Sequence, residues 1–220
     1  MKFKLVTLSV ILSFTLFNCK QESSTPEIPL LYANRNEIKL CNTKDSLLLN
    51  EALQSFETDL LDTYGDEKKN SNRAYTQFFN AVRTKRIDYT VMVSDHTKEV
   101  MEALKTQPGL WATDGTEYHL NYNSPIVECV RTNMAESGFK TTFNALLDTN
   151  SMSYRMYGEA IRKQTTILSK DKYLALFVAL DIYYAKLFNV NFTKAEGAAS
   201  NIDFNAAPPK KEDSHEGHNH

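Results

Sequence analysis

The chain has 220 residues and a formal net charge of -2; 42% of its residues are hydrophobic and 24% are charged. This is the composition of a folded domain of ordinary size, and it lacks the basic excess of nucleic-acid-binding proteins, so we exclude nucleic acid as a main partner. The chain contains only 7 Gly and 6 Pro, which leaves few residues for sharp turns. This scarcity favours a mainly helical fold over a β-sandwich with many turns.

The first residues have the pattern of a secretory signal. Two lysines precede a mostly apolar run over residues 5–17, which is shorter than the roughly 20 apolar residues that a membrane-spanning helix needs. The next segment, Leu16-Phe17-Asn18-Cys19, resembles the lipobox of bacterial lipoproteins, although Phe17 and Asn18 stand where that family usually has small residues. The resemblance implies that the signal is cleaved before Cys19 and that the Cys19 thiol is acylated.

The same resemblance implies a location. A triacylated Cys19 would anchor the chain stably, since each buried methylene contributes about 0.8 kcal/mol and stable anchoring needs more than one acyl chain. Lys20 follows, in place of the aspartate that retains some lipoproteins in the inner membrane. The resemblance therefore implies the outer membrane and leaves the leaflet open. The alternatives are cleavage by an ordinary signal peptidase, which Phe17 and Asn18 fit poorly, and an uncleaved anchor, for which the apolar run is short.

The rest of the chain is expected to form one domain between two disordered segments. We expect a signal peptide at 1–18, a polar tether at 19–31, a helical domain at 32–190 and a disordered tail at 191–220.

Within the helical domain, apolar residues recur at steps of three and four, which is typical of amphipathic helices. This pattern predicts a single bundle of about six helices. The predicted helices cover residues 45–64, 73–86, 94–105, 125–147 with a bend or division at Gly138, 154–168, and 170–189 with Ser169 as the cap. Residues 87–93 are compatible with strand or helix, and residues 37–41 with a short extended piece.

Residues 110–123 break the helical pattern. Asp114-Gly115 stands between residues of high β propensity, which predicts a β-hairpin with a type I′ turn. A two-residue turn at this dipeptide would place Trp111 opposite Tyr118. Trp111, Tyr118 and His119 could bind a small ligand or glycan, whereas the alternative is an ordinary exposed hairpin with one cross-strand aromatic pair.

Two cysteines remain besides Cys19. Cys41 and Cys129 lie too far apart in the sequence to form a zinc knuckle. In an oxidising envelope compartment they could pair and tie the N-terminal segment to the helix after Pro125. The alternative is two separate buried thiols that behave as small apolar side chains.

The carboxyl end contains three of the chain's 5 histidines, His215, His218 and His220. Neutral imidazoles at this spacing can bind Zn²⁺, Ni²⁺ or Cu²⁺. Because a disordered site loses chain entropy on binding, it would suit metal capture rather than catalysis. The alternative is a solvated polar tail with incidental affinity.

The sequence lacks the motifs of several large enzyme classes. It contains no His-Glu-x-x-His, no Gly-x-Ser-x-Gly, no glycine loop for phosphate and no Cys-x-x-Cys-His. We therefore expect a non-enzymatic envelope lipoprotein that requires no cofactor and whose helical domain binds a protein or another envelope component. The alternatives are a lipoprotein that handles a divalent metal through its tail, and a hydrolase with a dispersed site near the hairpin.

Overall fold

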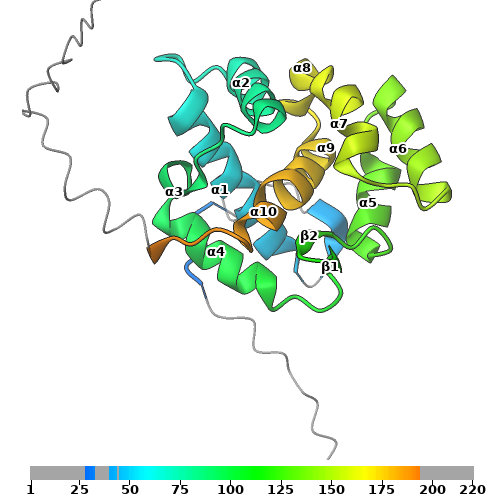
Figure 1. Cartoon of the computed structure of the whole chain (residues 1–220), viewed down its shortest axis with the longest axis horizontal. Helices are drawn as coiled ribbons and strands as arrows, with labels where there is room; N and C mark the ends of the chain where they lie inside the picture. The colour runs from blue at the N-terminus through cyan, green and yellow to red at the C-terminus, as the bar shows by residue number, and fades with distance from the viewer. Residues whose placement is uncertain (1–27, 33–39, 44, 194–220) are drawn as a thin grey trace, which may run out of the picture.

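The computed structural model describes residues 28–32, 40–43 and 45–193 (Figure 1). These residues form a mainly α-helical bundle with a small antiparallel hairpin, which confirms the predicted fold class. The helices are α1 (Ser46–Tyr64), α2 (Ser71–Thr84), α3 (Tyr89–Met92), α4 (Asp95–Lys105), α5 (Pro125–Asn133), α6 (Gly138–Asp148), α7 (Tyr154–Arg162), α8 (Thr165–Leu168), α9 (Lys172–Phe177) and α10 (Ala185–Leu187). The hairpin consists of β1 (Trp111–Asp114) and β2 (Glu117–Leu120). None of the described helices is both long enough and apolar enough to cross a bilayer.

Helix α1 is the long helix against which the first half of the chain packs. Its apolar residues at steps of three and four, Leu49, Leu53, Phe56 and Leu60, are all buried, and they face α2, α4 and the C-terminal helices. The helix ends where the backbone N–H of Gly65 donates to the carbonyl of Leu61. The hydrophobic period therefore explains both the helix and the face that it buries.

Several predicted helix starts match the structure because side-chain caps determine them. Ser94 accepts a hydrogen bond from the N–H of Thr97 at the start of α4, and Ser124 accepts one from Val127 at the start of α5. The predicted division near Gly138 is also present, since α5 ends at Asn133 and α6 begins at Gly138.

Two expectations about the second half are wrong. The predicted helix over 154–168 is divided into α7 and α8 by a tight turn in which the N–H of Gln164 donates to the carbonyl of Ile161. The last helix is capped by Asp171, which accepts from the N–H groups of Tyr173 and Leu174. Ser169 does not cap it, because its hydroxyl donates to Asn72 Oδ1 at 3.0 Å.

The last helix lies in the middle of the bundle (Figure 1). Between α9 and α10 the backbone widens into a π-helical segment, Val178–Tyr184, which we call the π segment. Every residue from 174 to 185 is buried, and one of them, Asp181, is acidic. Short π-helical stretches inside α-helices occur frequently at functional sites, so the residues around this segment are candidates for a functional site.

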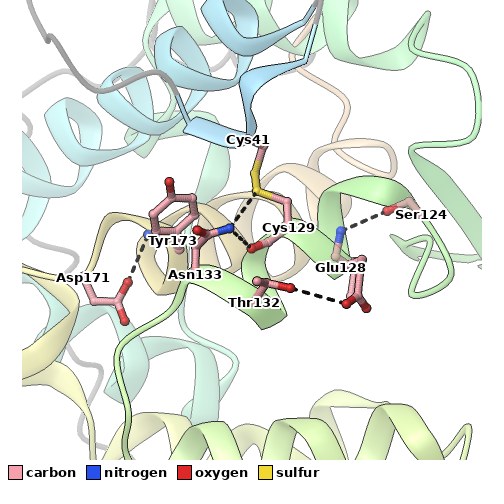
Figure 2. The surroundings of a disulfide bond; sticks show 9 residues. Cys41, Ser124, Glu128, Cys129, Thr132, Asn133, Asp171 and Tyr173 are labelled. Carbon is pink, nitrogen blue, oxygen red and sulfur yellow. Dashed lines mark hydrogen bonds between the residues drawn. A yellow bond between two sulfur atoms is a disulfide. The ribbon is translucent and has the colours of Figure 1, made fainter.

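A disulfide joins the start of the described chain to α5 (Figure 2). Cys41 and Cys129, for which the sequence left pairing and separate thiols open, are bonded with a Cα–Cα distance of 5.6 Å. Cys41 lies in a 3₁₀ turn, Leu40–Asn42, and has a positive φ of 59°. The described part of the predicted extended piece at 37–41 is therefore a turn and not a strand, and residues 37–39 lie outside the described residues.

Described residues on both sides of the predicted domain, residues 32–190, pack against it. Ile28 packs against the core, and the N–H groups of Leu31 and Tyr32 donate to Glu51. At the other end, Phe192 packs against the core and lies 5.4 Å from the Lys98 ammonium. The predicted signal peptide, Cys19 and the histidines at 215, 218 and 220 lie outside the described residues.

Candidate functional site

A cavity of about 580 Å³ lies beside the hairpin. Its wall comes from the end of α2, the segment leading into α3, both hairpin strands, the residues before α7, and the π segment. These elements are distant in the sequence, so only the folded chain brings them together. The volume lies within the range of about 300–1,000 Å³ that is typical of small-molecule sites.

The wall of this cavity is mainly apolar and aromatic. Its apolar members include Val82, Ile87, Met152 and Ile182, and its aromatic members are Tyr89, Tyr118, Tyr122 and Tyr154. Two of the tyrosines are held by stacking. The Tyr118 ring stacks on Phe188 at a centroid distance of 3.9 Å, and the Tyr122 ring stacks on His119 at 4.9 Å. These contacts fix ring orientations before any ligand binds.

Asp181 is the buried carboxylate of the cavity wall. It is 5% exposed, and its Oδ1 accepts from the N–H of Leu120 at 2.8 Å. Its Oδ2 accepts from the hydroxyls of Tyr122, at 3.2 Å, and Tyr157. Burial raises the pKa of Asp181, while the hydrogen bonds from Tyr157, Leu120 and Tyr122 and the charge of His119 act in the opposite direction.

The two tyrosines that donate to Asp181 remain protonated. Burial raises the pKa of Tyr157 and of Tyr122 above the ordinary tyrosine value, and the negative charge of Asp181 raises both further. Each phenol therefore serves as a hydrogen-bond donor to Asp181.

The rim of the cavity carries charges of both signs. Lys186 pairs with Glu117 at 2.8 Å, and the hydrogen bond from Lys186 lowers the pKa of Glu117. Arg83 and Lys85 also line the cavity, and within the described ranges neither makes an ion pair shorter than 4.0 Å. The lining thus combines three cationic side chains with three acidic ones, of which only Asp181 is buried.

His119 has a defined tautomer when it is neutral. Its Nδ1 lies 2.8 Å from the carbonyl oxygen of Leu120, and a carbonyl can only accept, so Nδ1 carries the proton. The Nε2 atom is then an acceptor and lies 3.9 Å from Asp114. The imidazole therefore presents an acceptor to the cavity rim.

The structure separates the three hairpin residues that the sequence had grouped. Tyr118 and His119 line the cavity, but Trp111 does not. The indole N–H of Trp111 donates to the carbonyl of Leu104 at 2.8 Å, and its ring packs edge-on against Phe188. Trp111 therefore holds the hairpin against the bundle.

The predicted pairing of the hairpin is wrong. Trp111 pairs with Leu120, and Tyr118 pairs with Thr113. The turn is formed by Gly115 and the residue after it, and only Gly115 has a positive φ, of 62°. This is the pattern of a type II′ turn, which requires glycine first, and not of the expected type I′ turn at Asp114-Gly115.

Sequence reasoning missed Asp181, Tyr122, Tyr157 and Tyr89 as residues of one site. A signal for Asp181 was nevertheless present, because it is the single acidic residue in the apolar stretch 173–188. A charged residue on the buried face of a central helix needs a partner or a function.

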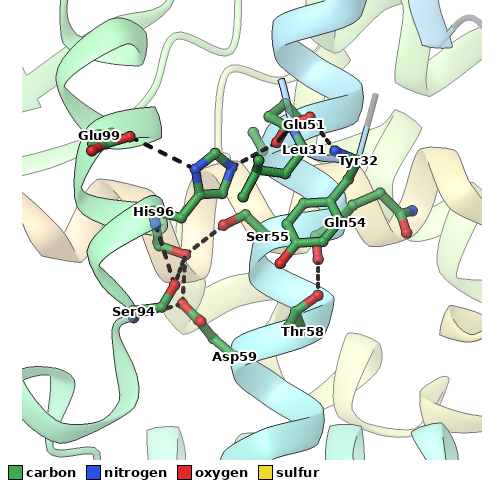
Figure 3. Close-up of polar contacts among 12 residues, drawn as sticks. Leu31, Tyr32, Glu51, Gln54, Ser55, Thr58, Asp59, Ser94, His96 and Glu99 are labelled. Atoms are coloured by element: carbon green, nitrogen blue, oxygen red, sulfur yellow. Dashed lines mark hydrogen bonds and ion pairs between the residues drawn. The ribbon is translucent and has the colours of Figure 1, made fainter. Parts of the chain in front are cut away.

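A second polar cluster joins α1 to α4 (Figure 3). Asp59 Oδ2 accepts from the Thr97 hydroxyl at 2.6 Å, the Tyr183 hydroxyl at 2.7 Å and the N–H of Ser94 at 3.3 Å. Asp59, Thr97 and Tyr183 are buried and hydrogen-bonded to one another, and none of them lines one of the cavities described, so we assign the cluster a structural role.

Glu51 extends this cluster toward the start of the described chain (Figure 3). The His96 Nε2–H donates to Glu51 at 2.6 Å, and the N–H groups of Leu31 and Tyr32 donate at 2.7 and 2.9 Å. Glu51 thus holds the last residue of the predicted tether, Leu31, and the next residue, Tyr32, against α1. Among the described residues, no group of His, Cys, Asp and Glu side chains is arranged to hold a metal ion.

Comparison with known proteins gave no relative: no protein-family model, no curated protein and no solved structure matches this chain. A functional assignment therefore depends on the chemistry of the site and on the sequence signals already described.

Proposed function

We propose that this chain is a lipid-anchored protein of the bacterial outer membrane that binds a small amphipathic molecule in the cavity beside the hairpin. One observation carries the binding proposal: a cavity of about 580 Å³ joins an aromatic and apolar wall to the buried carboxylate of Asp181. Largely apolar cavities with a few convergent polar groups are the usual form of small-molecule sites. A buried ionisable group with a shifted pKa in such a cavity adds support.

A small ligand suits this surface better than the protein partner that the sequence led us to expect. Standard protein interfaces bury about 800 Å² on each side around exposed apolar residues. Among the described residues, the large apolar side chains that are clearly exposed are Leu31, Leu47, Val91 and Met156, which come from four different segments. Apolar and aromatic groups of the described residues gather instead in the wall of the cavity.

The location proposal is supported by the lipobox-like segment that ends at Cys19. Nine residue steps separate Cys19 from Ile28, the first described residue. A fully extended chain of that length spans about 30 Å, so the domain would operate within this distance of the bilayer surface.

Replacing Cys19 with serine should move the protein from the membrane fraction to the soluble fraction. As a control, Asn18→Ala brings the segment closer to the common lipobox and should leave the protein in the membrane fraction. Membrane retention of the Cys19→Ser protein would contradict the proposal.

The binding proposal can be tested without knowing the ligand. Nile red, a neutral dye whose fluorescence rises in apolar surroundings, should bind the protein carrying Cys19→Ser. Met152→Trp places a large ring in the cavity wall and should abolish most of this signal. Met156→Trp is the matched control, because Met156 is 57% exposed and lies outside the cavity. Equal dye fluorescence in the two folded variants would refute binding at this site.

A metal-handling role remains a second candidate because of His215, His218 and His220. Three imidazoles within six residues can capture a divalent metal without a preformed site. A protein truncated after Pro209 should then lose nearly all of its affinity for Zn²⁺, Ni²⁺ and Cu²⁺ in calorimetry. Unchanged affinity would remove this candidate.

A further inference from the structure

We infer that the molecule bound in the cavity beside the hairpin carries an ammonium group that pairs with Asp181. This inference rests on the proposed binding function and adds the chemical class of the ligand to it.

The first argument is that Asp181 has no ion-pair partner among the described residues, although the charge of His119 acts on it. Two other acids have a basic partner, since the buried Glu51 pairs with His96 at 2.6 Å and the partly buried Glu57 pairs with Lys172 at 2.8 Å. Within the described part of the chain, no Lys or Arg side chain comes within 4.0 Å of Asp181. An ionised carboxylate without a cation is costly to bury, so a cationic ligand would relieve this cost.

Asp59 provides an instructive comparison, because it also lacks a basic partner. Its Oδ2 receives hydrogen bonds from Thr97, Tyr183 and the N–H of Ser94, and Asp59 lines no cavity. Asp181 differs because it lines a cavity of sufficient size for a ligand. Only Asp181, of these two acids, is therefore accessible to an external cation.

The second argument is the acceptor capacity that remains on Asp181. An ionised carboxylate can accept about four hydrogen bonds, and Asp181 receives three, from Leu120, Tyr122 and Tyr157. The bond from Tyr122 is 3.2 Å long, whereas O–H···O bonds are commonly about 2.7–2.8 Å. An ammonium N–H can take the remaining position, and a charged donor makes a stronger bond than a neutral one.

The third argument is the aromatic wall. Tyr89, Tyr118, Tyr122 and Tyr154 all line the cavity. The faces of aromatic rings attract a cation within about 6 Å of the ring centroid, and this attraction grows when the cation is desolvated. An ammonium at Asp181 would thus have tyrosines near it, while Val82 and Met152 would contact the carbon body of the ligand.

The basic residues of the rim are the counter-argument to a cationic ligand. Lys186 pairs with Glu117 at 2.8 Å. Arg83 and Lys85 also line the cavity and have no ion-pair partner within 4.0 Å among the described residues, while Asp114 adds an acidic group to the same lining. The opposite hypothesis, an anionic ligand bound at Lys85, is a distinct outcome of the test.

The test compares three probes of similar shape: 2-phenylethylammonium, 2-phenylethanol and 3-phenylpropanoate. Each competes with Nile red for the protein carrying Cys19→Ser at pH 7, where an alkylammonium is fully charged. We expect the ammonium to bind at least about tenfold more tightly than the alcohol, which gives a ratio of affinities of about ten or more. Asp181→Asn should bring this ratio close to one and leave the affinity for the alcohol within about twofold. Asp114→Asn, the same substitution on the exposed rim, should leave most of the ratio in place.

The outcomes separate this inference from the proposed function. If Nile red binds but the alcohol or the propanoate equals or exceeds the ammonium, the ammonium assignment is overturned and the binding cavity stands. Dye binding with no competition by any probe also overturns the assignment. An equal loss of the ratio in Asp114→Asn and Asp181→Asn would show a general charge effect and would overturn the pairing with Asp181. Absence of dye binding would remove the proposed function and the inference together.

Discussion

Removal of the Cys41–Cys129 disulfide should destabilise the domain strongly. The two cysteines are 88 positions apart, so their bond closes a long loop in the unfolded chain. In the chain-entropy treatment, a loop of this length lowers the entropy of the unfolded state by about 15 cal/mol/K, which corresponds to about 4.6 kcal/mol at 25 °C. Folded domains have a free energy of unfolding of about 5–15 kcal/mol, so this bond would supply a large share. The melting temperature should fall by roughly 9–18 °C for a domain of this size.

The assay is urea unfolding followed by circular dichroism, with Cys19→Ser in every protein. Replacing Cys41 and Cys129 with serine should lower the free energy of unfolding by about 4–5 kcal/mol. Reductant should lower the parent protein to a similar value and should not change the serine variant. A difference below about 1 kcal/mol between parent and variant would refute the reasoning, as would a reductant effect that persists without the two cysteines.

Three further predictions concern single positions, each checked by urea unfolding. Asp59→Ala should lower the free energy of unfolding by about 3 kcal/mol or more, because it removes the acceptor of three hydrogen bonds. Asp59→Asn, which keeps an acceptor oxygen, should lower it less. Equal losses in the two variants would contradict a role for these hydrogen bonds. Gly115→Ala should lower the free energy of unfolding by about 1 kcal/mol because the φ of Gly115 is 62°, which disfavours a residue with a Cβ. Gly138→Ala should not lower it, because Gly138 lacks a positive φ and, as at Gly115, no atom lies within 4 Å of the added Cβ. Burial raises the pKa of Asp181, so the folded state holds the proton more tightly than the unfolded chain, and stability falls as the pH rises from about 4 toward the folded pKa. The free energy of unfolding of Asp181→Asn relative to the parent should therefore rise with pH over this window, and a pH-independent difference would count against it.

Much of the fold could be predicted because local chemistry determines it. Ser94 and the Ser124-Pro125 pair start helices through bonds made within one turn, and those bonds depend only on neighbouring residues. The apolar period of α1 is equally local. The π segment and the division between α7 and α8 were not predicted, because the helical period is similar on both sides of each irregularity. Tertiary packing decides such features, and it depends on residues that are far away in the chain.

The candidate site could be predicted only in part, and the hairpin shows why. The dipeptide Asp114-Gly115 predicted a turn near this position, but the turn lies one residue later, at Gly115-Thr116, so Trp111 pairs with Leu120 and not with Tyr118, two positions earlier on β2. A displacement of two positions changes which residues lie opposite one another but leaves each side chain on the same face of the hairpin. The strand pairing also depends on a contact with a residue that lies far away in the sequence.

That contact is the hydrogen bond from the N–H of Leu120 to Asp181, which joins residues 61 positions apart. It fastens the end of β2 to the π segment, and it places His119 and Tyr118 in the wall of the same cavity as the carboxylate. The hairpin is therefore a structural part of the site, although its sequence has the features of an exposed turn. If the binding proposal is correct, substitutions that loosen the hairpin, such as Gly115→Ala, should weaken binding of Nile red more than they reduce helical content. Unchanged dye affinity in a hairpin-destabilised variant would show that the cavity does not depend on the hairpin for its shape.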